Sequence, residues 1–168
     1  MFLRIVSAVI FSVAGGFAGI SFSEHLKSNL ELCHKIKEMF LNSKIIIRCR
    51  ADDVYAIATE FKNNKSFEKL TFLNELPEKY SPEEDFHEMW SSAVESQKSI
   101  PDDIKKILFD FGAVLGQSDI EGQLASIDAI SENAEVLEKK YSEMYSQKGK
   151  LYRSVGLLFG VMIGILII

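Results

Sequence analysis

The 168-residue chain has little of what marks a catalytic, metal-binding or disulfide-bonded protein. It holds two cysteines, three histidines and three prolines. Cys33 and Cys49 are too few for a disulfide framework and suit a reducing compartment. Glycine-rich phosphate loops, Gly-x-Ser-x-Gly and Cys/His/Asp arrangements are absent, and His25, His34 and His87 lack a second ligand at metal spacing. We therefore expect no catalytic residue, no metal site and no cofactor, in a protein that is not an enzyme.

Strand patterns are lacking as well. The one β-like run, residues 44–49, is too short and too isolated for a sheet. Apolar residues recur instead at three- and four-residue spacing, which predicts helices. We expect an all-α fold, an antiparallel helical bundle that lies between an N-terminal and a C-terminal transmembrane helix.

Charge is absent from residues 5–22, and only Arg153 interrupts residues 151–168. Eighteen helical residues reach about 27 Å, close to the roughly 30 Å of bilayer hydrocarbon. Each end therefore has the length of a membrane span. The predicted division is an anchor at residues 1–23, a helical bundle at 24–150 and a second anchor at 151–168, with Lys148, Lys150, Tyr152 and Arg153 at the membrane interface.

A cleaved signal peptide is the alternative for the first segment. Arg4 supplies a basic start, and Gly16-Phe17-Ala18 is a small-x-small sequence of the kind that is cleaved. Against it, the apolar run is longer than usual and leads without a turn signal into the helical pattern of residues 26–40. We therefore favour a retained anchor.

Charge is distributed unevenly along the rest of the chain. Residues 24–50 hold six Lys/Arg and three Glu, residues 52–138 hold seven Lys and twenty Asp/Glu, and residues 139–153 hold five Lys/Arg and one Glu. Basic flanks mark the cytoplasmic side of a membrane and attract its anionic lipids, so we expect a two-pass protein of the cell membrane with a cytoplasmic bundle. The acidic middle argues against nucleic acid, and we favour a solubilising surface over a dock for a basic partner.

The bundle has clear helix boundaries. Capping residues, prolines and acidic first turns predict each start, and Asn or Gly predicts an end. Glu83, Glu84, Asp85 and Glu88 fit a helix N-terminus rather than an acid/base pair. The expected helices are residues 54–61 after Asp52-Asp53, 67–76 capped by Ser66, a helix opened by the capping box Ser81-Pro82-Glu83-Glu84, 102–115 opened by Pro101, and 119–168 without a break.

The turn before the last helix reads Leu115-Gly116-Gln117-Ser118-Asp119, with Gln123 nearby. Glycine in a left-handed conformation and a Ser or Asp cap are what a tight interhelical turn requires. We expect Ser118 with Glu121 to form a capping box. Turn chemistry alone does not demand Gln117 or Gln123, so contact with a partner is the alternative reading of these two residues.

Glycines recur every four residues in the last segment, at Gly156, Gly160 and Gly164. Ala8, Ser12 and Gly16 form a matching small-residue stripe in the first segment, with Gly15 and Gly19 offset by one residue. Such stripes let membrane helices approach closely, either the two anchors of one chain or the anchors of neighbouring copies. The alternative is that glycine is simply common in membrane helices.

The residues at 115–119 and Gln123, followed by Lys148 and the run Lys150-Leu151-Tyr152-Arg153-Ser154-Val155-Gly156, resemble stage III sporulation protein AB of endospore-forming bacteria. The resemblance covers the whole length, although residues 44–98 carry it only through their pattern. That family is similar to the helical domain of the inner-membrane platform protein of type II secretion systems. It implies a part in the channel complex between mother cell and forespore, beside a secretion-type ATPase, and it offers no catalytic residues.

Three functions follow as hypotheses. The leading one is a membrane scaffold subunit that forms oligomers, contacts an ATPase and other channel subunits, and binds lipid but no nucleic acid. The second is a membrane-anchored sensor or adaptor that signals along its last helix. The third, a membrane enzyme, is disfavoured because catalytic residues are missing.

Overall fold

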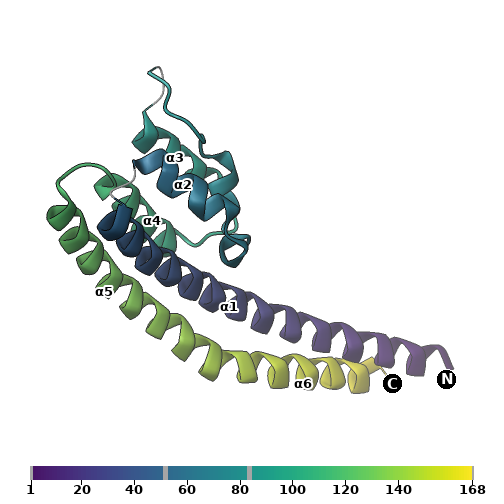
Figure 1. Ribbon diagram of the computed structural model, residues 1–168. Helices are drawn as coiled ribbons and strands as arrows, with labels where there is room; N and C mark the ends of the chain where they lie inside the picture. The colour runs from purple at the N-terminus through teal and green to yellow at the C-terminus, as the bar shows by residue number, and fades with distance from the viewer. Residues whose placement is uncertain (1, 51–52, 83–84, 168) are drawn as a thin grey trace. The chain divides into compact units, whose positions relative to one another are not determined.

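The structure is a computed structural model that describes residues 2–50, 53–82 and 85–167 (Figure 1). Every regular element in these ranges is a helix, so the predicted all-α class is confirmed. Short 3-10 segments, η1 and η2, join the first helices, and a π-helical segment, η3, joins the last two. The elements are α1 (Phe2–Arg50), α2 (Val54–Asn63), η1 (Lys65–Phe67), η2 (Thr71–Glu75), α3 (Phe86–Ser96), α4 (Asp102–Val114), α5 (Ile120–Met144), η3 (Tyr145–Gly149) and α6 (Lys150–Ile167).

The chain divides into two compact units. The terminal unit comprises Met1–Leu30 and Lys139–Ile168, and the central unit comprises Glu31–Glu138. Both α1 and α5 contribute residues to each unit. The predicted domain limits at residues 23 and 150 stay a prediction.

Large aromatic side chains build the core of the central unit. Trp90 of α3 is fully buried, and its Nε1 donates a hydrogen bond of 2.8 Å to the Leu108 carbonyl of α4. Its ring lies within 5.6 Å of Phe111, which stacks on Phe40 of α1 at 4.4 Å. Burying each such ring contributes about 3 kcal/mol, so these contacts fix α1, α3 and α4 together.

Three predicted helix boundaries are correct. Asp53 caps α2, since its Oδ1 accepts a hydrogen bond of 2.8 Å from the Ala56 amide. Asn64 follows the last residue of α2, and α4 begins directly after Pro101. The expected left-handed residue after α4 is Gly116, with φ of 73°.

Other boundaries were wrong. Residues 67–76 do not form an α-helix, because the chain here forms the 3-10 segments η1 and η2. Asn64, and not Ser66, caps η1, since the Asn64 side chain accepts a hydrogen bond from the Ser66 amide. Phe67, Phe72 and Leu73 are buried, and this packing explains the difference. Because the core fixes these side chains, the backbone follows the tighter 3-10 geometry in place of an α-helix.

The predicted start of α3 was also wrong. Ser81 and Pro82 lie outside the helix, which begins at Phe86 with Asp85 as its cap. Glu83 and Glu84, the remainder of the predicted capping box, lie outside the described residues. The β-like run at 44–49 belongs to α1, where Ile46 and Ile47 pack into the core.

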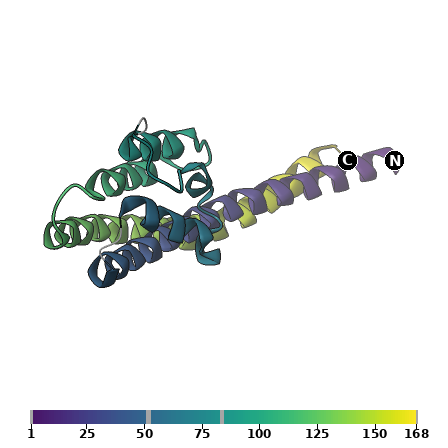
Figure 2. The ribbon, with the colours of Figure 1, turned by 45° about the horizontal axis from the view of Figure 1, so that its top comes forward.

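In the terminal unit, the first part of α1 runs beside α6, as Figures 1 and 2 both show. Phe22 and Tyr152 bring their ring centroids within 5.5 Å. The predicted unbroken helix from residue 119 contains the π-helical turn η3, which no sequence signal indicated. Within the described part of the chain, none of the helices combines the length and the apolar character of a membrane span.

Candidate functional site: the turn between α4 and α5

The backbone of the turn is fixed by its glycine. Leu115 is fully buried, and Gly116 adopts a positive φ that other residues rarely adopt. A Cβ at Gly116 would also lie 2.8 Å from Cγ1 of Val54 in α2. Both the conformation and the space therefore require glycine, and the turn brings α2 close to the end of α4.

Gln123 clamps this turn from α5. Its Oε1 accepts a hydrogen bond of 3.0 Å from the Gly116 amide, and its Nε2 donates one of 2.7 Å to the Ser118 carbonyl. One side chain thus satisfies a donor and an acceptor that the turn leaves unpaired. These two hydrogen bonds therefore explain why glutamine occurs at position 123, which turn chemistry alone did not.

The start of α5 is capped by Asp119. Its Oδ1 accepts from the Gly122 amide at 2.9 Å, and its carbonyl accepts from the Gln123 amide at 2.9 Å. The predicted capping box of Ser118 and Glu121 is therefore wrong, because the cap falls one residue later. Ser118 instead places its hydroxyl 3.4 Å from the Asp119 carbonyl.

Gln117 points to a histidine that the sequence gave no reason to select. Its Nε2 lies 2.9 Å from His87 Nε2, while His87 Nδ1 lies 2.8 Å from the Gly112 carbonyl. The carbonyl only accepts, so Nδ1 carries the hydrogen and Nε2 accepts from Gln117. Far from being a lone surface residue, His87 links α3 to α4 and to the turn.

Gly112 sits behind this histidine for a steric reason. A Cβ there would lie 2.2 Å from Cδ1 of Trp90, so the indole ring occupies the space of a side chain. The order from core to surface is thus Trp90, Gly112, His87 and Gln117. Gln117 is the exposed end of this set of contacts.

The predicted packing residues lie in the terminal unit. A Cβ at Gly156 would lie 2.5 Å from the Gly15 carbonyl and 3.1 Å from Gly19 Cα, so α6 and α1 approach backbone to backbone there. A Cβ at Gly149 would lie 3.2 Å from Ser23 Oγ. The side chains or packing of Gly160, Gly164, Ser12, Gly16, Lys150 and Arg153 lie outside the described set.

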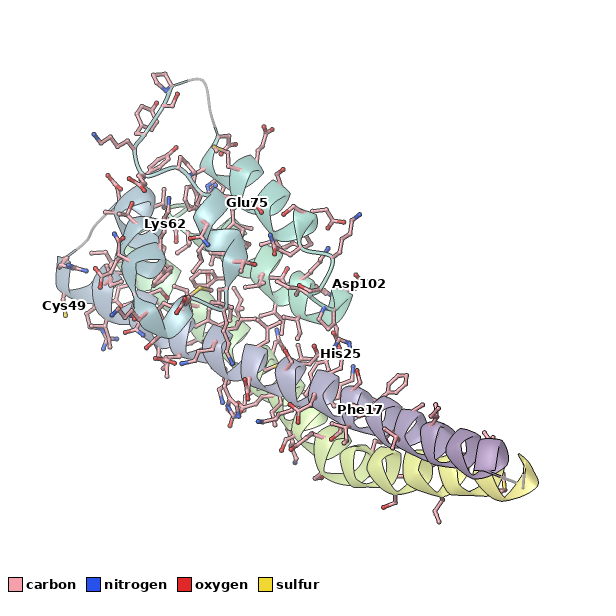
Figure 3. All side chains as sticks on the ribbon, turned by 90° about the vertical axis from the view of Figure 1, so that its right-hand side faces the viewer. Phe17, His25, Cys49, Lys62, Glu75 and Asp102 are labelled. Atoms are coloured by element: carbon pink, nitrogen blue, oxygen red, sulfur yellow. The ribbon has the colours of Figure 1, made fainter. Side chains whose placement is uncertain are left out.

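Two interface predictions fall on described side chains. Lys148 is exposed on the π-helical segment, and Tyr152 is 38 % exposed on α6. Phe17 of α1 projects outward in Figure 3 and is 69 % exposed. Large apolar side chains are thus left uncovered in this unit.

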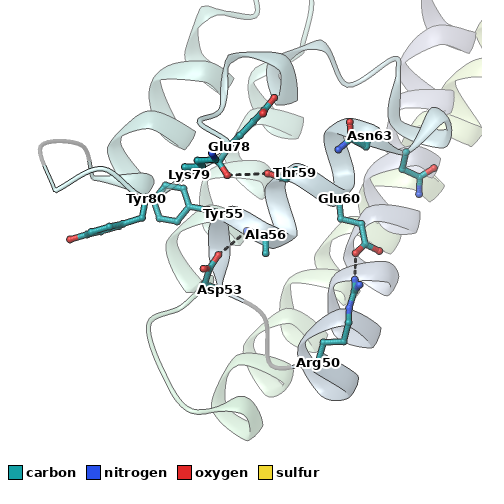
Figure 4. Close-up of a pocket in the computed structure, with 11 residues that line it drawn as sticks. Arg50, Asp53, Tyr55, Ala56, Thr59, Glu60, Asn63, Glu78, Lys79 and Tyr80 are labelled. Carbon is teal, nitrogen blue, oxygen red and sulfur yellow. Dashed lines mark hydrogen bonds and ion pairs between the residues drawn. The ribbon is translucent and has the colours of Figure 1, made fainter.

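An open hollow of about 720 Å³ lies beside α2 (Figure 4). Arg50 pairs with Glu60 at its edge, and Lys62 pairs with Glu78 at 2.9 Å. The hydrogen bond from Lys62 holds the pKa of Glu78 below its usual value. Two ion pairs of the described residues thus lie at this hollow, and its charged side chains Arg50, Glu60 and Glu78 are engaged in them.

The described residues form an all-helical protein in which the turn between α4 and α5 is held by side-chain hydrogen bonds and leaves the side chain of Gln117 exposed. The family model for stage III sporulation protein AB matches residues 4–168. The chain belongs to this family, and the membership gives it a role in stage III of sporulation. Comparisons with curated proteins and with solved structures gave no significant match.

Proposed function

We propose that this protein is a non-enzymatic scaffold subunit of a secretion-like channel complex between mother cell and forespore. The observation that carries the proposal is the family match, which includes both apolar ends as well as the helical bundle. A sporulation protein whose sequence has no recognisable catalytic constellation is best explained as one that joins other proteins into a complex. Its partners are other channel subunits, among them a secretion-type ATPase, and it assembles as an oligomer.

The ends of the chain serve as membrane anchors in this proposal. Residues 5–22 carry no charge, and residues 151–168 carry one. Many side chains in these stretches lie outside the described residues, so the anchors rest on the sequence. The backbone contact at Gly156 supports them, because close glycine packing is how membrane helices associate without a hydrophobic driving force.

The central unit then lies in the mother-cell cytoplasm, where its turn and surface meet partners. Basic flanks at residues 24–50 and 139–153 support this orientation. Cys49 is exposed and Cys33 is buried, so an impermeant maleimide distinguishes the two sides of the membrane at one residue.

The test is a tagged chain expressed in sporulating cells. We expect it in the membrane fraction, with Cys49 labelled only after permeabilisation, and with the ATPase and other channel subunits recovered by affinity purification and mass spectrometry. Recovery from the soluble fraction contradicts the anchors, and labelling in intact cells contradicts the orientation. Purification without any channel subunit contradicts the scaffold function.

A further inference from the structure

One face of α1 in the central unit exposes large apolar side chains on consecutive turns. Leu41 is 57 % exposed and Ile45 is 60 % exposed, four residues apart. Cys49 is exposed one turn later, at the end of α1 (Figure 3). Phe40 and Ile47, on the opposite side of the helix, fill the core, so this second apolar face has another purpose.

Basic residues border this face. An open hollow of about 530 Å³ runs along it, lined by Leu41, Lys44, Ile45, Arg48 and Cys49. Lys44 forms an ion pair with Asp128 of α5. Arg48 is exposed, and no described carboxylate forms an ion pair with it. A positive charge that has no ion-pair partner among the described residues thus lies beside exposed leucine and isoleucine.

The charge of the face is opposite to that of its surroundings. The described residues that line the hollow include two basic side chains, Lys44 and Arg48, and no acidic one, whereas residues 52–138 hold seven Lys and twenty Asp/Glu. Most of the central unit therefore repels an acidic partner, and Arg48 attracts one to this face. Charge complementarity thus favours an acidic partner here.

We propose that this α1 face binds an amphipathic helix of another protein, and the proposal rests on the scaffold function above. The partner's apolar residues, spaced i and i+4, pack on Leu41 and Ile45, and its flanking carboxylate pairs with Arg48. Spacing favours a helix, because the two side chains form a ridge along α1 that fits the groove of a second helix at 8–10 Å. Desolvation by the apolar contact strengthens the charge pair.

The first test maps what touches the face. The photo-crosslinker p-benzoyl-phenylalanine replaces Ile45 in the full chain in sporulating cells, and the matched control carries it at Val136, which is 71 % exposed on α5. We expect position 45, and not position 136, to crosslink to a peptide with helical apolar spacing and flanking acids. A lipid adduct, a peptide from a second copy of this chain, or no enrichment over position 136 overturns the proposal.

The second test asks whether charge directs the binding. Arg48→Glu should weaken binding of the mapped partner at least tenfold, and reversing the partner's adjacent carboxylate to lysine should restore it. Lys98→Glu, an equal charge change at another exposed residue, should leave binding intact. Helical circular dichroism and melting should be unchanged in both variants, since neither side chain is in the core. Arg48→Glu with full binding overturns the proposal.

The protein from which the crosslinked peptide comes distinguishes the proposal for the α1 face from the proposed scaffold function. An acidic amphipathic helix from a channel subunit supports both. The same kind of helix from a protein outside the complex supports the α1 face and contradicts the scaffold function. A channel subunit that crosslinks through a basic or non-helical segment contradicts the α1 face and leaves the scaffold function standing.

Discussion

The two units of this chain pack their helices by opposite means. In the central unit, large rings fill the space between helices, and the Trp90 ring occupies the space that a side chain at residue 112 would take. In the terminal unit, the backbone of α1 occupies the space that a side chain at residue 156 would take. The first arrangement uses burial of apolar area from water, and the second uses van der Waals contact between backbones, which works without water. The same residue type therefore serves two different kinds of helix packing.

Removing the central ring should have the largest effect. Trp90→Ala deletes a fully buried indole and its hydrogen bond to Leu108, so we expect a loss of about 3–5 kcal/mol in the free energy of unfolding. Thermal unfolding followed by helical circular dichroism measures it. Val136→Ala, at an exposed site, should change stability by less than about 0.5 kcal/mol. A loss below about 1 kcal/mol for Trp90→Ala would show that the ring is not the centre of this core.

Filling the space beneath the ring should be the next most harmful change. The new methyl of Gly112→Ala lies 2.2 Å from Trp90 Cδ1, so the ring must move. We expect a cost of about 1–3 kcal/mol and a shift in tryptophan fluorescence, which this chain reports from its single Trp. Ala113→Ser, at the exposed neighbouring position, is the control. An unshifted spectrum in Gly112→Ala contradicts the close contact.

The matching change in the terminal unit should act locally. Gly156→Leu separates the backbones of α1 and α6 but leaves the core of the central unit intact. Cysteines at Phe22 and Tyr152, whose ring centroids lie 5.5 Å apart, should be joined by a short bifunctional thiol cross-linker several-fold more slowly in this variant. Leu158→Ala, which is 64 % exposed in the parent, should leave the rate unchanged. Equal rates in Gly156→Leu and its parent would mean that the glycine contact does not hold the two helices together.

The two units also differ in how far the sequence predicts them. Helix α4 was predicted correctly from Pro101, the two acidic residues of its first turn and the helical spacing of its apolar residues. The prediction succeeded because local signals and tertiary packing agree there. The predicted α-helix over residues 67–76 was wrong, since Phe67, Phe72 and Leu73 are held by the core against their local α-helical pattern. The glycine spacing at 156 and the small residues of the first segment, Gly15 and Gly19 among them, were visible in the sequence. Whether these segments pack on each other or on neighbouring copies depends on tertiary structure, so the sequence left both options open.

The candidate site shows the same limit. Gly116 and an acidic cap could be predicted from turn geometry, although the cap was placed at Ser118 instead of Asp119. His87 could not, because its partners Gly112 and Gln117 lie 25 and 30 residues away. Long-range pairs leave no periodic signal in a sequence, whereas caps and turns do.

Within the turn, the two glutamines should respond unequally. Gln123→Ala removes hydrogen bonds to both Gly116 and Ser118, and we expect a cost of about 1–2 kcal/mol. Gln117→Ala removes one exposed contact to His87 and should cost less than about 0.5 kcal/mol. Chemical denaturation at neutral pH measures both. The reverse order would indicate that the contact from Gln117 to His87, and not the clamp, holds the turn.

The smallest expected effect concerns a surface ion pair on α1. The hydrogen bond from Lys35 to Glu38 lowers the pKa of this carboxyl from its usual 4.5. A lowered pKa in the folded state means that the pair stabilises the fold above about pH 4.5 and that this contribution disappears as the pH falls through the folded pKa. Because the Glu38 side chain is 41 % exposed, water and salt screen the pair, and about 0.2–0.5 kcal/mol is expected. Glu38→Gln should therefore be less stable than the parent by this amount at pH 7 and indistinguishable from it near pH 3. A difference that persists at pH 3, or that grows with added salt at pH 7, would mean that Glu38 acts through packing and not through its charge.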